Sequence, residues 1–525
     1  MTTYTCPRCG TGRLIKDGKT AGRKQRWACK GPNGYCYTTT DPAADAVINQ
    51  RGDRVKGSRP LKFKRTISPD TKVFIITSAQ NATPVHEAFW QCLLSMKAHL
   101  DAELMVIPLR YKNATSQWTA SQQNAEWWDK QVTPYLYNAR KALNTNLDVL
   151  ADIKTQPTAS SPLTGFEAIS HGESCIIGHT KLQMKVVPTP SHKFPKIITT
   201  TGACTKVNYT DSKAGKLGEF HHSLSAVIVE VAGEKTFHLR HVHFDNKTST
   251  VTDLDVLYDI TGAWEAPRPL ALIMGDTHVD FIDPGVERAT FGEGGIIEVL
   301  NPERLVWHDL LDAYAVNPHH RGNPFNQIAK RRTNRDDVKA EVERAVAFVN
   351  SNTPADLRSY IVPSNHDNFL SRWVSAHDWR TDAVNAEFYL QTALEMVRQT
   401  SMQKSGTSTV NPFAHWVREW GESNVTCLKM DEALTLGGVE LGMHGDMGPN
   451  GAKGSIRNLR RIGMRSVVGH SHSPGIDEGC YQVGTSTHLR LEYNAGPSGW
   501  LNTHCVLHAD GKRQLINIIN GYWRL

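Results

Sequence analysis

Short apolar runs followed directly by histidine, aspartate or asparagine recur through the second half of the chain. Such a run is typical of a short buried strand whose carboxyl end presents polar side chains. We therefore predict five strands there, each with a polar cluster at its end. The runs are Leu272–Met274, Leu305–Trp307, Tyr360–Val362, Val439–Leu441 and Val467–Val468.

The chain between residue 66 and the first of these runs has a different pattern. Lys72–Thr77 is predicted to be a buried strand, Pro84–Asp101 a helix and Leu104–Pro108 another strand, which begins an α/β unit. Leu224–Val231 and Thr236–His243 are also predicted to be strands. We can name no family for this region.

Histidines His238, His241 and His243 lie on one of these predicted strands. They permit two interpretations, a metal site or ordinary strand residues. Alternation puts His241 and His243 on one face of the strand, but no third ligand is evident there. We therefore expect side chains that face solvent or nucleic acid.

Three later segments have helical patterns. Asp336–Asn350 is amphipathic, and apolar residues recur at helical spacing in Asp382–Gln403. Asp446–Arg461 carries several basic side chains just after His444, so we expect a basic helix that engages phosphate. Basic residues at 319–321 and 330–332 could likewise contact substrate phosphates or form an ordinary charged surface.

Charge is unevenly distributed along the chain. The net charge of the 525 residues is +7, yet residues 1–66 alone hold 15 lysines and arginines against four aspartates, a surplus of 11. The remainder is slightly acidic, at −4. A basic arm on an acidic body indicates that the arm docks on a polyanion, and DNA is the partner we expect. The alternative is a solvated basic linker without a defined partner.

The arm also carries Cys6, Cys9, Cys29 and Cys36. A Cys-x-x-Cys pair with two further thiols can close a tetrahedral zinc site, and about forty residues could not bury enough core to fold unaided. We predict a zinc ribbon at residues 1–40 with one structural Zn, followed by a basic linker at 41–66. A reduced or redox-active Cys-x-x-Cys is the alternative.

Length and composition limit the remaining possibilities. A chain of 525 residues is too long for one core, so we expect two sizeable domains beyond the ribbon. No run of eighteen apolar residues and no basic-then-apolar leader occurs, so we expect neither a membrane span nor export. The other six cysteines are scattered, which fits reduced thiols in a cytoplasm.

The polar clusters at the five predicted strand ends supply the ligands of a two-metal hydrolytic site. Two divalent ions about 3.5–4 Å apart need a bridging carboxylate and further imidazole, carboxylate and amide ligands. Nitrogen and oxygen ligands without thiolate suit Mn, Fe, Zn or Co better than Ca or Mg. Mn is the first choice, with Fe, Zn or Mg as other candidates. The clusters are Asp276 with His278, Asp309, Asn365 with His366 and Asp367, His444, and His470 with His472.

The order Asp-x-His, Asp, Asn-His-Asp, His, Gly-His-x-His resembles the calcineurin-like metallophosphoesterases. The resemblance implies a four-layer α/β/β/α domain at 266–525. It also implies one metal on Asp276, His278 and His472, another on Asn365, His444 and His470, and Asp309 as the bridge. His366 would act on the leaving oxygen, Asp367 would orient His366, and a bridging hydroxide would attack phosphorus.

Two positions depart from that pattern. His308 and Ser364 stand where the family usually has glycine, before the bridging aspartate and before Asn-His-Asp. The family glycines serve the backbone and ligate nothing, so the replacements indicate a divergent branch rather than a lost ligand.

The expected function is a metal-dependent phosphodiesterase acting on DNA. The Gly469–Gly475 ending resembles SbcD/Mre-type nucleases, and the overall layout resembles phage early proteins that degrade or handle DNA. The domains would be the ribbon, the linker, an α/β or α+β domain of unassigned function at 67–265, and the phosphoesterase at 266–525. We expect a cytoplasmic protein, in the host cytoplasm if phage-encoded, and leave a homo-oligomer open.

Two other functions are compatible with the same residues. A phosphatase or cyclic-nucleotide phosphodiesterase of the same fold would turn over small aryl phosphates. A non-catalytic DNA-binding or assembly protein with a vestigial metal site would bind DNA without cutting it.

Overall fold

The structure is a computed structural model that describes residues 14–19, 25–31, 34–39, 73–111, 127–320, 322–402 and 410–524. The protein is a mixed α/β protein with several sheets. The chain separates into two compact units. Unit 1 comprises Met1–Val187 and Phe194–Ala266, and unit 2 comprises Pro188–Lys193 and Pro267–Arg524.

A small antiparallel sheet lies near the N-terminus of the chain. Its strands are β1 (Leu14–Lys19), β2 (Gln25–Gly31) and β3 (Gly34–Thr39), in that order. Leu14 is paired with Cys29, and both side chains are buried. The predicted linker at 41–66 lies outside the described residues.

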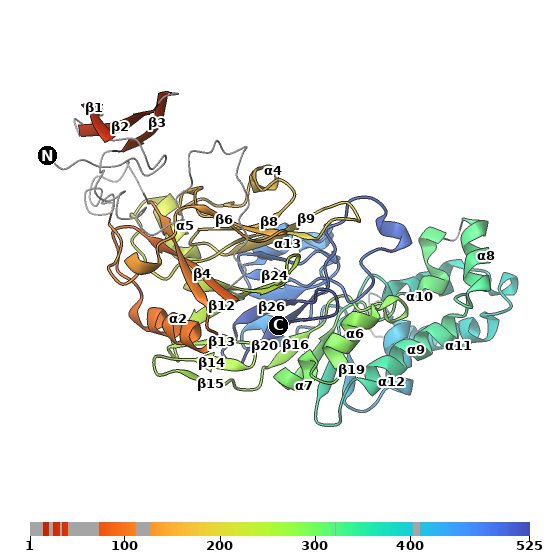
Figure 1. The fold of residues 1–525 in the computed structure, drawn as a ribbon. Helices are drawn as coiled ribbons and strands as arrows, with labels where there is room; N and C mark the ends of the chain where they lie inside the picture. The colour runs from red at the N-terminus through yellow and green to blue at the C-terminus, as the bar shows by residue number, and fades with distance from the viewer. Residues whose placement is uncertain are drawn as a thin grey trace. The chain divides into compact units, whose positions relative to one another are not determined.

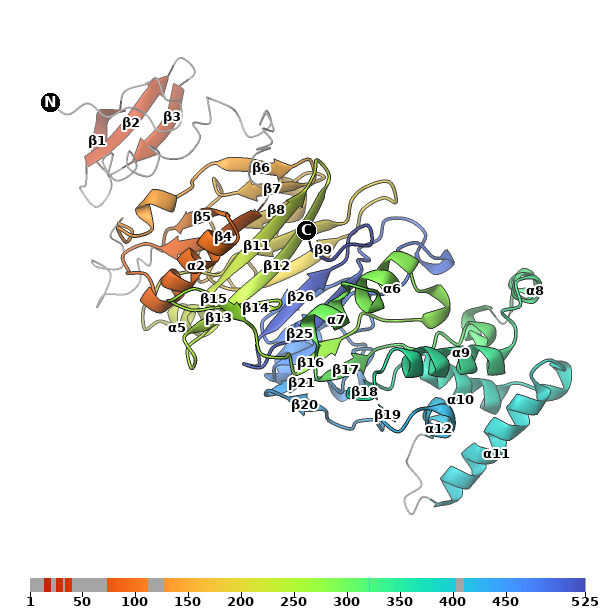
Figure 2. The same ribbon diagram turned by 60° about the horizontal axis from the view of Figure 1, so that its bottom comes forward.

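The larger sheet of unit 1 is built around β4, the first strand predicted in this region. β4 is buried along almost its whole length and runs parallel to β5. All other neighbouring strands of this sheet are antiparallel to each other. Helix α2 (Glu87–His99) lies beside β4 and β5 (Figure 2). Its Phe89, Trp90 and Leu93 are buried in the core of this sheet. Across the sheet the strands are β15 (Ala263–Glu265), β14 (Val256–Tyr258), β13 (Thr250–Asp253), β12 (Thr236–Asp245), β11 (Ser225–Ala232), β4 (Val73–Gln80) and β5 (Glu103–Leu109).

Unit 1 contains a second group of hydrogen-bonded strands. Its order is β9 (Gln183–Val187), β10 (Lys196–Thr200), β8 (Ser174–Ile177), β7 (Leu147–Leu150) and β6 (Arg140–Asn144). Cys175, Ile177 and Ile198 form a core with residues of the short helix α4 (Phe166–Ile169). The other helical segments of unit 1 are α5 (Lys213–His221) and the 3-10 turn η2 (Thr133–Tyr135).

Unit 2 has a sheet whose first half is parallel, as expected of strands joined by helices. Its order is β19 (Val425–Cys427), β18 (Arg358–Ile361), β17 (Arg304–Trp307), β16 (Ala271–Ile273), β25 (Thr503–Leu507) and β26 (Arg513–Asn517), with β16 to β19 parallel to one another. A second group follows the order β20 (Thr435–Leu436), β21 (Val439–Glu440), β22 (Ser466–Val468), β24 (Cys480–Gln482) and β23 (Gly475–Asp477).

Helices connect the parallel strands of unit 2. In both views the helices that follow β17 and β18 extend from the β19 edge of this sheet (Figures 1 and 2). The connecting helices are α6 (Pro284–Phe291) and α7 (Ile296–Leu300) before β17, α8 (Pro324–Arg332) and α9 (Val338–Ser351) before β18, and α10 (Asp367–Ala376), α11 (Ala386–Met402) and α12 (Pro412–Trp420) before β19. Among the described residues, no helix has the length and apolar character needed to cross a bilayer.

The predicted helix at Asp446–Arg461 is wrong for most of its length. Only α13 (Ile456–Leu459) is α-helical, flanked by the 3-10 turns η7 (Pro449–Gly451) and η8 (Arg460–Ile462). Glycines explain the difference, because Gly451 has a positive φ and a Cβ on Gly454 would lie 1.8 Å from the carbonyl oxygen of Gly445.

The expected exposure of the β12 histidines is also wrong for two of them. His238 and His241 are buried, and His241 Nε2 lies 2.8 Å from Thr199 Oγ1. The expectation failed because both faces of this strand are covered, so alternation along it does not separate a wet face from a dry one.

Candidate metal centre

The predicted clusters follow strands of unit 2 directly. β16, β17 and β18 are parallel, so the segments after their last residues leave the sheet at the same edge. Asp276 and His278 follow β16, Asp309 follows β17, and Asn365 and His366 follow β18. His444 follows β21, and His470 and His472 follow β22, which is parallel to β21.

The side chains at these strand ends meet in two groups. In the first group, His472 Nε2 lies 3.2 Å from Asp276 Oδ2 and 3.2 Å from His278 Nε2. In the second, His470 Nδ1 lies 2.9 Å from Asn365 Oδ1.

Asp309 lies between the two groups. Its Oδ2 atom is 3.1 Å from His444 Nε2, on the side of His470, and 3.6 Å from His278 Nε2. His278, Asp309 and His472 can offer ligand atoms to one ion, and Asp309, His444 and His470 to another. One carboxylate therefore contacts both candidate sets.

One oxygen of each central carboxylate is buried and unsatisfied. Within the described part of the chain, Asp276 Oδ1 and Asp309 Oδ1 have no hydrogen-bond partner, although both residues are at most 1% exposed. Buried carboxylate oxygens without partners are costly unless a cation neutralises them. The donor set of imidazole, carboxylate and amide atoms fits a divalent transition ion.

The carboxylates and imidazoles shift each other's proton affinities. Burial raises the pKa of Asp309, but the charges of His444 and His366 outweigh it and hold that pKa well below its ordinary value. Burial lowers the pKa of His444, yet the charge of Asp309 and a hydrogen bond to it raise that pKa to about 9. The pocket therefore attracts positive charge, and a bound metal ion would take the place of those protons.

The backbone at four candidate ligands is held in the left-handed region. Non-glycine residues adopt it at a cost of about 1–3 kcal/mol, and they persist there when the surrounding structure enforces it. Such strain is concentrated at functional sites. The residues are His278 (φ 40°), Asp309 (φ 42°), His470 (φ 73°) and His472 (φ 58°).

Asp312 belongs to the site, although the sequence pattern did not identify it. Its Oδ1 lies 2.9 Å from His278 Nδ1, and its main-chain oxygen lies 2.6 Å from His366 Nδ1. The carboxylate thus fixes the ring of one candidate ligand, an arrangement common around metal-binding histidines. The available signal was its spacing three residues after Asp309.

The orienting role expected of Asp367 is therefore corrected. The carboxylate of Asp367 accepts hydrogen bonds from Ser364 and from Asn411 Nδ2, at 3.3 and 3.2 Å. Burial, with the charge of Asp309, raises the pKa of Asp367 to about 7. Asp367 secures the turn that carries Asn365 and His366, while Asp312 contacts the His366 ring.

His308 and Ser364, the two departures from the family pattern, both take part in these contacts. His308 is fully buried, and its Nδ1 lies 3.4 Å from Nδ1 of His444. Burial, with the charge of His444, lowers the pKa of His308 to about 4. His308 is thus a neutral ring beside a candidate ligand, and Ser364 Oγ lies 3.3 Å from Asp367 Oδ1.

Two other groups of predicted residues have different outcomes. Cys6 and Cys9 lie outside the described residues, Cys29 is buried in β2, and only the backbone of Cys36 is described. The ribbon thus stays a prediction.

Lys330 cannot serve as a surface phosphate contact because it is buried, with its Nζ 3.2 Å from the main-chain oxygen of Ala315.

Fold and site together define a mixed α/β protein with buried His/Asp groups that could hold metal. The chain is 29% identical over 488 residues to Protein A1 of Escherichia phage T5. The aligned region covers 91% of this chain and 87% of Protein A1. The chain is therefore similar to a phage protein over most of its length. No family model matches the chain, and no solved structure matches it.

Proposed function

We propose that the chain is a metal-dependent phosphodiesterase that hydrolyses DNA, with a calcineurin-like metallophosphoesterase domain at residues 266–525. The observation that carries this proposal is the meeting of side chains from five strand ends around Asp309, with buried carboxylate oxygens left for a cation. The parallel strands β16 to β19, linked by helices, support an α/β layering.

The residues of the pocket would divide the work of metal binding. Asp276, His278 and His472 would hold one divalent ion, and Asn365, His444 and His470 the other, with Asp309 contributing to both. Two such ions, when bound, supply a reactive water and neutralise charge on the phosphate. Mn is the first choice among the metals that suit this donor set.

His366 is placed to act on the leaving group. Its side chain is 17% exposed, whereas those of His278 and His444 are fully buried. Because Nδ1 donates to the main-chain oxygen of Asp312, Nε2 is left to face a substrate. A protonated Nε2 can donate its proton to the leaving oxygen as the ester bond breaks.

DNA is the substrate best supported by the chain outside the pocket. The basic arm at residues 1–66 would attract a polyanion, and counterion release would make that binding salt-dependent. Similarity to a phage protein supports a phage origin and action in the host cytoplasm. A structural zinc held by the four cysteines of the arm belongs to the same proposal.

The full chain should be incubated with linear, circular and single-stranded DNA and with an aryl phosphodiester, each with Mn, Mg or EDTA. We expect DNA cleavage with Mn and none with EDTA. Turnover of the aryl ester without cleavage of any DNA would replace the DNase proposal by a small-substrate phosphodiesterase. Salt-sensitive DNA binding with no hydrolysis of any substrate would indicate a non-catalytic protein.

A further inference from the structure

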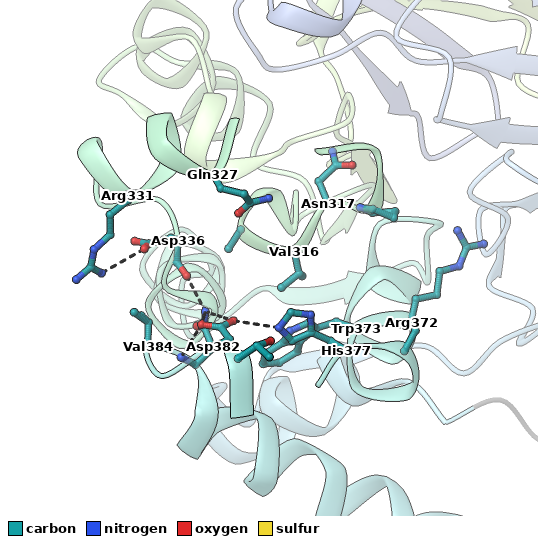
Figure 3. Close-up of a pocket in the computed structure, with 15 residues that line it drawn as sticks. Val316, Asn317, Gln327, Arg331, Asp336, Arg372, Trp373, His377, Asp382 and Val384 are labelled. Carbon is teal, nitrogen blue, oxygen red and sulfur yellow. Dashed lines mark hydrogen bonds and ion pairs between the residues drawn. The ribbon is translucent and has the colours of Figure 1, made fainter. Parts of the chain in front are cut away.

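A cavity of about 790 Å³ lies in unit 2 among the helices that follow β17 and β18 (Figure 3). Its size is within the range of small-molecule sites. No residue of the candidate metal centre lines it. Its walls include Val316, Asn317, Gln327, Arg372, Ala376 and Val384.

Two segments that form walls of the cavity follow residues of the candidate metal centre closely along the chain. One wall starts with Ala315, three residues after Asp312, which contacts the His366 ring. The other is the second half of α10, whose first turn follows His366 directly. Arg372 is six residues from His366, about 9 Å along the helix at 1.5 Å per residue. The cavity is therefore close to the reacting phosphate that we propose.

The acidic side chains of the cavity are already engaged. Arg331 donates to Asp336 at 3.2 Å, and Asn385 Nδ2 donates to Asp382 at 2.9 Å. His377 Nε2 lies 3.7 Å from Asp382 as well (Figure 3). Arg331 therefore balances the charge of Asp336, and hydrogen bonds from Asn385 occupy the carboxylate of Asp382.

Arg372 is the contrasting group. It is exposed, and it forms no ion pair with any residue that the structure describes. In Figure 3 it extends from α10 on the side of the cavity where Asn317 lies. An uncompensated guanidinium at the edge of a cavity favours an anionic ligand, phosphate above all.

The remaining walls favour a flat ligand with a hydrogen-bonding edge. Val316, Ala376 and Val384 are apolar, while the amides of Asn317 and Gln327 offer donors and acceptors. An apolar plane, a polar edge and a negative charge are together the features of a nucleotide.

We propose that this cavity binds one nucleotide of a DNA strand, next to the phosphodiester at the metal centre. The base lies between Val316, Ala376 and Val384, and Arg372 contacts a backbone phosphate. This inference rests on the proposed function for its substrate, but binding at the cavity does not require metal.

The test is equilibrium binding to the full chain in EDTA, with a single-stranded tetranucleotide and, separately, deoxynucleoside monophosphates. Ala376→Trp fills the cavity from an exposed position, and Ser375→Trp, at the adjacent exposed position outside it, is the matched control. We expect Ala376→Trp to weaken tetranucleotide binding about tenfold or more, since base contacts contribute about 1–3 kcal/mol. Ser375→Trp should leave the binding unchanged.

Arg372→Gln should also weaken tetranucleotide binding and reduce its salt dependence. Equal binding by wild type and Ala376→Trp would overturn the inference. Loss of mononucleotide binding alone would also overturn it, because the cavity would then hold a free nucleotide rather than part of a strand. Cleavage is measured separately, so a chain that binds DNA here but cuts nothing would refute the proposed function and leave this site intact.

Discussion

Asp309 differs from the other residues of the candidate centre in that its carboxylate contacts both groups of histidines. Its carboxylate faces both groups of imidazoles, its backbone has φ 42°, and its pKa is held well below the ordinary value. The His366 ring contacts Asp312, and its side chain is more exposed than that of Asp309. The two residues should therefore fail in different ways when replaced.

Asp309→Asn and His366→Ala should both reduce DNA hydrolysis by a factor of about 100 or more, as expected for loss of a metal ligand or a general acid. Only Asp309→Asn should lower the metal content, measured by mass spectrometry after gel filtration. Asp378→Asn, at an exposed carboxylate outside the centre that pairs with Arg380, is the control. Equal metal loss in the two variants would reject the role given to His366.

Gly469 leaves no room for a side chain beside the candidate centre. A Cβ at this position would lie 2.2 Å from Asp276 Oδ1 and 3.0 Å from the Cβ of His308. Gly469→Ala should therefore displace Asp276 and weaken metal binding about tenfold or more, measured by titration with Mn. Gly322→Ala, where a Cβ meets nothing within 4 Å, should bind as the wild type does. Unchanged affinity in Gly469→Ala would show that Asp276 is not a ligand.

Sequence reasoning was strongest for residues placed by strand ends and weakest for residues placed by packing. The positions of Asp276, Asp309 and His444 followed from apolar runs that the structure has as β16, β17 and β21. Asp312 could not be found in that way, because it does not stand directly at a strand end and is brought to His278 by the path of the loop after β17.

At the scale of elements, long periodic segments were predicted well. The helix expected at Pro84–Asp101 is α2, and that expected at Asp336–Asn350 is α9. The segment Asp446–Arg461 failed because basic side chains were given more weight than its glycines. The order of strands in the sheets could not be predicted, since it depends on contacts between distant segments.

The strands of unit 1 enclose a neutral histidine that should make this unit sensitive to acid. The N–H of Lys181 donates to His179 Nδ1 at 2.9 Å, and His179 Nε2 lies 3.0 Å from the oxygen of Gln156, which fits one neutral tautomer. Burial lowers the pKa of His179 to about 4. Below pH 6.5 the unfolded chain gains a proton that the folded chain does not, so stability falls until about pH 4.

The full chain should therefore lose stability between pH 6.5 and 4, with His179 contributing on the order of 3 kcal/mol. The urea midpoint followed by circular dichroism measures this loss. His179→Gln should make the dependence on pH shallower, whereas His192→Gln, at an exposed histidine, should not. An unchanged slope in His179→Gln would mean that His179 does not contribute to this loss.

At the scale of the whole molecule, the two units and the basic arm suggest separate roles. The candidate centre and the cavity both lie in unit 2, whereas residues 1–66 carry the excess positive charge. Sequence alone separated the arm from the body by charge. It gave no function for residues 67–265, whose sheets are largely hydrophobic core without a cluster of unsatisfied carboxylates among the described residues.

The central claim is that five strand ends in unit 2 form one two-metal centre. An anomalous difference map from crystals of the full chain soaked in Mn tests it most directly. We predict two peaks about 3.5–4 Å apart, both within coordinating distance of Asp309, one beside Asp276 and His472 and the other beside His444 and His470. A map with no peak at Asp309, or with Mn bound only elsewhere on the chain, would contradict the account.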